Sequence, residues 1–152
     1  MTEIIERSVS VPLSPSEAFH LFFEEFGRWW PREYTWGQEA MEAIGIEPHV
    51  GGLCFERGPR GFRCDWGRIL EWEPPHRAKL AWQISPRREP VPNPEKASVV
   101  EVRFKPEGSD HTRVTVTHGG FERHGAGASE YRAALASDQG WSYLLGQFVA
   151  AV

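Results

Sequence analysis

The sequence predicts an α+β domain in which a curved antiparallel sheet of about six to seven strands wraps around a long C-terminal helix. A short helical region is expected near the N-terminus. Apolar residues between positions 42 and 118 alternate as they do in strands, whereas the large apolar residues from Tyr131 onward follow one helical face, which predicts a helix over 129–152. Such a helix can bury its apolar stripe only against the preceding sheet, so residues 1–152 should form one domain.

The N-terminal elements follow from local signals. Residues 3–11 alternate as a strand. Ser14–Glu17 reads Ser-Pro-Ser-Glu, the pattern of a capping box with proline at the first helical position, and predicts a Phe-rich helix that ends at Gly27. An aromatic loop over residues 28–36 should then cover one end of the sheet.

The strands of the sheet are placed by the parity of their apolar residues. Expected hairpin pairings of 55 with 64, 70 with 80, and 104 with 112 keep each apolar set on one face, which favours one strongly curved sheet. A proline-rich stretch over 85–97 should be a mobile loop. The marker positions are Ile44 and Ile46, Leu53 and Phe55, Phe62 to Trp72, Ala78 to Ile84, Ser98 to Phe104, and Val114 to His118.

Composition limits the possible partners. A net charge of −4 and a pI of 5.9 give no general attraction for nucleic acid or anionic membranes. No segment approaches the roughly 18 apolar residues needed to cross a bilayer, and no leader pattern opens the chain, so we expect a cytoplasmic protein without membrane insertion. Cys54 and Cys64 lack metal-like spacing, and pairing of Phe55 with Cys64 would put the two thiols on opposite faces, both free and packed. No metal, nucleotide or phosphate motif is present, so we expect no cofactor.

Four segments carry a resemblance to a known family: Ser14–Phe19, Gly27–Pro31, Gly67–Pro75, and Thr117–Glu122 with the later Gly140-Trp141. In order and spacing they are similar to the activator of Hsp90 ATPase homologue-like family of the START and Bet v 1-like (SRPBCC) superfamily. The resemblance implies a helix-grip fold with a hydrophobic cavity between the sheet and the C-terminal helix. The Hsp90 connection belongs to eukaryotic members with a separate N-terminal domain; we expect none here, so the family name does not imply that activity.

Two polar residues have the parity of the inner face. Arg68 shares the parity of Trp66 and Leu70, and an inward guanidinium would need an anionic partner, either Asp138 or a ligand carboxylate or phosphate. The alternatives are a bulge that turns Arg68 outward, or a purely structural pair. His118 could orient a ligand or act as an acid or base, or it could satisfy backbone groups where its strand ends.

Seven tryptophans are present, and those at 66, 72, 82 and 141 fall on inferred inward faces. They either line a cavity or simply fill the core. Our leading hypothesis is a protein that binds a small hydrophobic molecule, such as a lipid, a polyketide or an aromatic metabolite. The predicted ligand-binding residues are Trp66, Arg68, Leu70, Trp82, Val102, His118, Asp138, Trp141 and Leu145.

Two other function classes remain open. A cyclase or dehydratase could use the same cavity, with His118 and Asp138 as the one acid and base pair, although no known catalytic motif is present. A protein-interaction module, either a homodimer or a chaperone adaptor, would use Trp29, Trp30 and Trp36 as exposed anchors.

Overall fold

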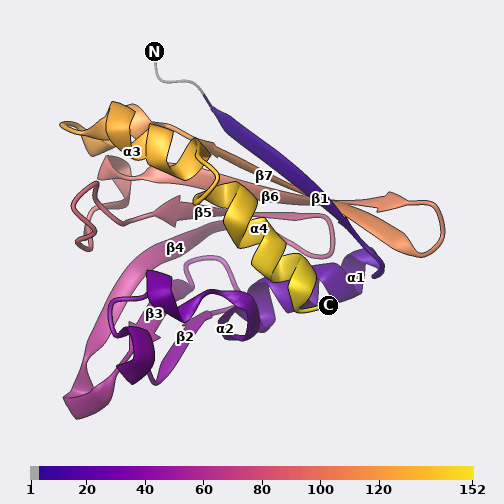
Figure 1. Ribbon diagram of the computed structural model, residues 1–152, viewed down its shortest axis with the longest axis horizontal. Coiled ribbons are helices and arrows are strands. Elements are labelled where there is room, and N and C mark those ends of the chain that lie inside the picture. Colours follow the sequence, from indigo (N-terminus) through magenta and orange to yellow (C-terminus); the bar gives the residue numbers. More distant parts are fainter. Residues whose placement is uncertain (1–3) are drawn as a thin grey trace.

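The computed structural model describes residues 4–152 and contains a seven-stranded antiparallel sheet in the order β1-β7-β6-β5-β4-β3-β2 (Figure 1). This order confirms the predicted fold class, a curved sheet that holds a C-terminal helix. Glu3, the expected start of the first strand, lies outside the described residues. The strands are β1 (Ile5–Val11), β2 (Ala43–Ile46), β3 (Leu53–Arg57), β4 (Arg63–Glu73), β5 (Arg77–Trp82), β6 (Ser98–Glu107) and β7 (His111–Gly119).

The helices lie on one side of the sheet, where α4 crosses the strands and packs against β1 and α2 (Figure 1). None of the helices in residues 4–152 is long and apolar enough to cross a membrane. The helical segments are α1 (Pro15–Phe19), the π-helical turn η1 (His20–Glu24), α2 (Phe26–Trp29), α3 (Ala128–Ala136) and α4 (Trp141–Ala150), with short turns η2 (Arg32–Tyr34), η3 (Gln38–Ala40), η4 (Pro59–Gly61), η5 (Pro94–Lys96) and η6 (Phe121–His124).

The predicted capping box starts the first helix. The Ser14 hydroxyl accepts a hydrogen bond from the Glu17 amide at 3.1 Å, and the Ser14 amide donates to the Glu17 carboxylate at 3.0 Å. The expected stop at Gly27 is wrong, because Gly27 lies inside α2. Its role is close packing: a Cβ at this position would lie 2.7 Å from the carbonyl oxygen of Ile44 in β2.

The C-terminal helix is bent and interrupted. We expected one helix over 129–152, but α3 and α4 are separated by residues 137–140. A Cβ on Gly140 would lie 2.0 Å from the carbonyl oxygen of Leu135, so only glycine permits the chain to fold back this closely. The break gives α3 and α4 different directions (Figure 1).

Strand β4 contains two bulges that the sequence analysis did not place. Cys54 pairs with Gly67 and Phe55 with Asp65, which leaves Trp66 as an extra residue. Further along β4, a register shift between 69 and 71 leaves residue 70 without a partner on β5. The side chains that follow the first bulge therefore reverse their faces relative to a regular strand.

The expected hairpin registers were wrong by one or two residues. We expected residue 55 to pair with residue 64, but Cys64 pairs with Glu56. We expected residue 70 to pair with residue 80, but Leu80 pairs with Ile69. Phe104 pairs with Val114 rather than with residue 112, a shift of two that preserves the faces. Because the side chains of Cys54 and Glu56 lie on the same face, both cysteines lie on the inner face, which corrects the expected opposite placement. Both thiols are free and buried, as predicted.

The core begins with the phenylalanines of the first helical segment. The Phe19 ring lies 4.9 Å from Trp72 and 5.1 Å from Phe104, and Phe22 lies 5.3 Å from Phe148 of α4. These contacts join the N-terminal helix, the sheet and α4 into one hydrophobic cluster. The α1 and α2 end of the space between α4 and the sheet is therefore filled by side chains.

Candidate functional site: an aromatic pocket between α3 and the loops

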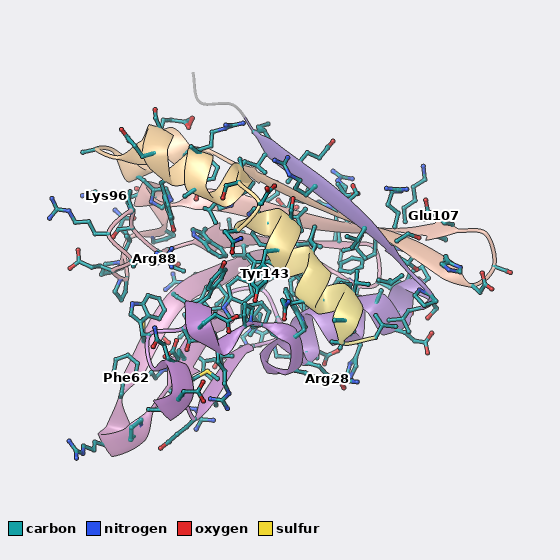
Figure 2. All side chains as sticks on the ribbon, viewed as in Figure 1. Arg28, Phe62, Arg88, Lys96, Glu107 and Tyr143 are labelled. Carbon is teal, nitrogen blue, oxygen red and sulfur yellow. The ribbon has the colours of Figure 1, made fainter. Side chains whose placement is uncertain are left out.

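A pocket of about 820 Å³ lies between α3 and the loops at the opposite end of the sheet. Six parts of the chain line it: the aromatic segment 30–38, the end of β5 with the following Ile84, the proline-rich loop, α3, the junction between α3 and α4, and Leu144 of α4. Arg88 marks the proline-rich loop in Figure 2. The pocket thus opens where the bend of the C-terminal helix turns α3 away from the direction of α4.

Aromatic rings form one wall of the pocket. Trp30 and Trp82 both line it, with ring centroids 6.1 Å apart. Behind them, Trp66 stacks on Trp30 at 6.3 Å with an interplanar angle of 17°, and Trp141 lies 5.7 Å from Trp82. Four indoles therefore pack as one unit, so the wall is rigid and the two front rings are held in place.

The aromatic segment is tied down at both sides of the pocket. The Tyr34 hydroxyl donates to the carbonyl of Gln139 at the α3–α4 junction, at 2.7 Å. On the other side, the Trp36 indole donates to the carbonyl of Arg88, also at 2.7 Å. These two hydrogen bonds join three segments that are distant in sequence into a continuous rim.

A buried carboxylate fixes the middle of the same segment. Glu56 is fully buried, and its two oxygens accept hydrogen bonds from the backbone amides of Trp36, at 3.0 Å, and Gly37, at 2.8 Å. A buried carboxylate needs such donors to offset the loss of hydration. Glu56 therefore anchors the rim to β3.

The pocket also holds a polar pair between β5 and α3. The Trp82 indole donates to the Tyr131 hydroxyl at 2.7 Å. Burial raises the pKa of Tyr131 to about 12, against a smaller opposing effect of the Trp82 hydrogen bond and the Arg88 charge. The phenol is therefore neutral and protonated at physiological pH.

A second polar group lies deeper, in the core. Trp141 donates to Nδ1 of His118 at 3.0 Å, so the hydrogen of this ring is on Nε2 and points to the Ser98 hydroxyl at 2.8 Å. Ser98 in turn donates to Nε2 of His124, also at 2.8 Å. The chain of hydrogen bonds joins α4 to β7, β6 and η6, and it runs in one direction because an indole can only donate.

This network gives His118 a structural role. The side chain is fully buried, and burial lowers its pKa well below the ordinary value of 6.5, with a further contribution from His124. Both ring nitrogens have partners, and the residue does not line the pocket. Within residues 4–152, no three His, Cys, Asp or Glu side chains gather as metal ligands would.

The structure separates the predicted site residues into three groups. Trp82 is the one that lines the pocket. Others lie behind the wall or in the core, and the rest face solvent. The buried group is Trp66, Val102, His118, Trp141 and Leu145, and the exposed group is Arg68, Leu70 and Asp138.

The inward orientation of Arg68 was wrong, and the stated alternative, a bulge that turns Arg68 outward, is confirmed. After the extra residue at Trp66, the buried position moves to Ile69, which is 1% exposed, and Arg68 turns to solvent. Leu70 is the unpaired residue of the second bulge and is 37% exposed. Gly67 permits the first bulge, since a Cβ there would lie 2.8 Å from the carbonyl oxygen of Ala81.

The proposed partner of Arg68 and the proposed catalytic pair were also wrong. Asp138 lies in the interruption between α3 and α4 and is exposed, because the helix that would have carried it inward ends at Ala136. His118 is sealed in the core, so these two side chains do not face a common pocket.

Several pocket residues were missed, although the sequence held signals for some of them. Trp30 and Trp36 were expected as exposed anchors of an interface, but both are partly buried and line the pocket, while Trp29 is 3% exposed and belongs to the core. Tyr131 was assigned only to the start of the predicted C-terminal helix. Arg88 had no recognisable signal, because its placement depends on how the proline-rich loop folds back on β5.

Comparison with known proteins agrees with this geometry. Residues 12–152 match the family described as "Activator of Hsp90 ATPase homolog 1-like protein". The chain belongs to this family. No curated protein sequence matches it.

Solved structures show the same fold. One is the anthrahydroquino-γ-pyrone synthase Txn09, which is 35% identical, with 99% of this chain and 97% of that chain covered and a TM-score of 0.70. Another is the self-sacrificing resistance protein CalC from Micromonospora echinospora, at 26% identity, 97% and 92% coverage and a TM-score of 0.66. Protein NE0264 from Nitrosomonas europaea, at 15% identity, 97% and 92% coverage and a TM-score of 0.67, shares the fold alone. The predicted helix-grip family is confirmed, and its fold is a ligand-binding one.

Proposed function

We propose that this protein binds a planar, polycyclic aromatic molecule of polyketide type in the pocket between α3 and the aromatic segment. One observation carries the proposal: a pocket of about 820 Å³ has a wall of Trp30 and Trp82, with Trp36 and Tyr34 at its rim. Flat rings stack favourably on such walls, and a volume of this size suits a small organic ligand.

The similar proteins support an aromatic ligand over an aliphatic one. The 35% identical Txn09 is named as a synthase of an anthrahydroquino-γ-pyrone, a compound of fused rings. One wall of the pocket consists of the rigid rings of Trp30 and Trp82, which also favours a flat ligand over an alkyl chain.

Binding can be tested with three probes: the planar fluorene and 9-fluorenone, and the aliphatic palmitate. We expect the two planar probes to quench tryptophan fluorescence with a stoichiometry of one, and palmitate to bind more weakly. Ala134→Trp should fill the pocket from α3, where residue 134 is exposed and lines it. The affinity should fall by at least about tenfold, which corresponds to about 1.4 kcal/mol.

A matched control is Phe62→Ala, which removes an exposed aromatic ring that does not line the pocket. This variant should bind like the wild type. Failure of both planar probes to bind up to their solubility would refute the proposal, and preferential binding of palmitate would replace the aromatic ligand with a lipid. Native mass spectrometry of freshly purified protein would show any retained ligand directly.

A second candidate is a cyclase-like enzyme that closes a ring of a polyketide-derived precursor in the same pocket. The identity with a synthase favours it. Liquid chromatography with mass spectrometry of such a precursor incubated with the protein should show a product of equal mass, or one lighter by one water, that the Ala134→Trp variant does not form. Binding without any such product would leave the protein as a binder.

A further inference from the structure

Tyr131 lies in α3 and lines the pocket, with its hydroxyl next to the indole nitrogen of Trp82, which lines the same pocket. The distance of 2.7 Å between the phenol oxygen and the indole nitrogen is a hydrogen bond of fixed direction. An indole N–H can only donate, so the phenol oxygen is the acceptor and keeps its own hydrogen for another partner.

That hydrogen has no protein acceptor among the hydrogen bonds of residues 4–152. The ring itself is held in place, with Phe121 at 6.1 Å and His124 at 5.2 Å, both in edge-to-face contact. A phenolic hydrogen lies close to the ring plane, on one side of the oxygen or the other. Because the Trp82 N–H occupies one side, the hydrogen is directed to the side that remains.

The charges around the pocket favour a neutral acceptor on the ligand. Arg88 lines the pocket as a cation, and its charge acts on the Tyr131 phenol. Glu33 and Glu130 also line it, so the lining has no excess of positive charge that would select an anionic ligand. A carbonyl oxygen accepts a hydrogen bond without bringing a charge.

We propose that Tyr131 is a specificity-determining hydrogen-bond donor, and that it makes the pocket select polycyclic aromatic ketones or quinones over hydrocarbons of the same shape. This inference rests on the proposed function, since it assumes that a planar aromatic molecule occupies the pocket. Trp82 orients the Tyr131 hydroxyl, because its indole N–H donates to one side of the phenol oxygen and leaves the other side for the phenolic hydrogen.

The probes 9-fluorenone and fluorene form a matched pair, because they differ in one carbonyl oxygen and have nearly the same planar outline. The quantity to measure is the ratio of their dissociation constants, which removes effects common to both ligands. In Tyr131→Phe, we expect the ratio to shift against fluorenone by about three- to tenfold, the contribution of one net hydrogen bond. The affinity for fluorene should change by less than about twofold, since no polar contact to it is lost.

One further variant separates the two donors of the pocket. In Tyr131→Phe the Trp82 N–H loses its acceptor and could itself reach the ligand, so the double variant Tyr131→Phe with Trp82→Phe is measured as well. A ratio that shifts only in the double variant would show that the Trp82 N–H can replace the phenol as the donor, so that Tyr131 does not determine the selectivity, and would overturn the inference. Circular dichroism and the melting temperature confirm that each variant is folded.

The remaining outcomes are distinguishable. If both probes bind the wild type and the ratio is the same in every variant, Tyr131 does not select the carbonyl, while the pocket still binds aromatic molecules. If neither probe binds the wild type, the proposed function fails, and the inference fails with it. Phe62→Ala serves again as the control and should keep the wild-type ratio.

Discussion

The network around His118 should make the stability of the fold depend on pH between 7.5 and 5.5. In the native state Nδ1 of His118 accepts the Trp141 indole hydrogen while Nε2 donates to Ser98. A second proton on the His118 ring would sit on Nδ1, so that this N–H and the Trp141 indole N–H would point at each other in the core with no acceptor between them. The folded state therefore excludes this proton, and the pKa of His118 is lowered by burial.

The sign and size of the effect follow from linkage. The unfolded chain binds a proton at His118 with a pKa of about 6.5, whereas the folded chain does not, so the free energy of unfolding decreases as the pH falls. A His118 that stays neutral throughout the window contributes a loss of about 1.4 kcal/mol between pH 7.5 and 5.5. The pKa of His124 is also lowered by burial and acts in the same direction. His20, whose pKa is raised mainly by a hydrogen bond to Glu24, acts in the opposite direction at an exposed site.

Urea denaturation at pH 7.5, 6.5 and 5.5 measures this dependence for the wild type and for His118→Gln. Glutamine can accept from the indole and donate to the hydroxyl, but it does not titrate. The variant should lose about 1.4 kcal/mol less than the wild type across the window. The contributions of His124 and His20 are largely common to both proteins and cancel in the difference.

His111→Gln is the matched control, because His111 is exposed, and this variant should follow the wild-type pH dependence. Parallel curves for the wild type and His118→Gln would refute the reasoning. They would mean that the buried imidazole takes up its proton in the folded state as readily as in the unfolded one.

Three further changes test the parts of the structure that shape the pocket. Gly140→Ala should destabilise the fold by at least about 2 kcal/mol in thermal melts, because a Cβ has no room there. Gly146→Ala is the control, since its Cβ would enter open space, and it should stabilise the fold by up to about 1 kcal/mol. Equal effects of the two substitutions would contradict the steric role of Gly140. Glu56→Gln should cost about 1.5 to 3 kcal/mol and speed hydrogen exchange of the amides at 36–37; unchanged exchange would show that the rim does not need this carboxylate. Arg68→Ala should alter stability by less than about 0.5 kcal/mol and leave fluorenone binding unchanged; weaker binding would restore Arg68 to the site.

The elements that the sequence predicted well are those specified by neighbouring residues. The capping box at Ser14 forms as expected because both of its hydrogen bonds lie within four residues. Strands β6 and β7 show the expected alternation, with Val100, Val102, Val114 and Val116 all buried. Buried and exposed side chains alternate regularly in these two strands because their pairing has no bulge over nine residue pairs.

Strand β4 shows where local pattern failed. Its bulges depend on the pairing with both neighbouring strands. The alternation of apolar residues in β4 alone does not show where an extra residue interrupts that pairing. A glycine at position 67, inside a strand whose apolar residues alternate with charged ones, was a readable sign of the bulge that turns Arg68 outward, which the sequence-based prediction gave only as an alternative. Likewise, the sequence Ser-Asp-Gln-Gly at 137–140 is typical of a break, but the helical periodicity on both sides of it hid the signal.

The position of the pocket could not be predicted for a different reason. The sequence placed tryptophans on the inner face and left open whether they line a cavity or fill the core, and their rings pack on one another and occupy the space between the sheet and α4. Space for a ligand remains where the aromatic segment, the proline-rich loop and α3 meet, and these segments approach one another only in the folded chain. The core and the pocket therefore share the indoles of Trp30 and Trp82 but not the loops, and we expect substitutions within 33–38 and 85–97 to affect binding more than they affect the fold.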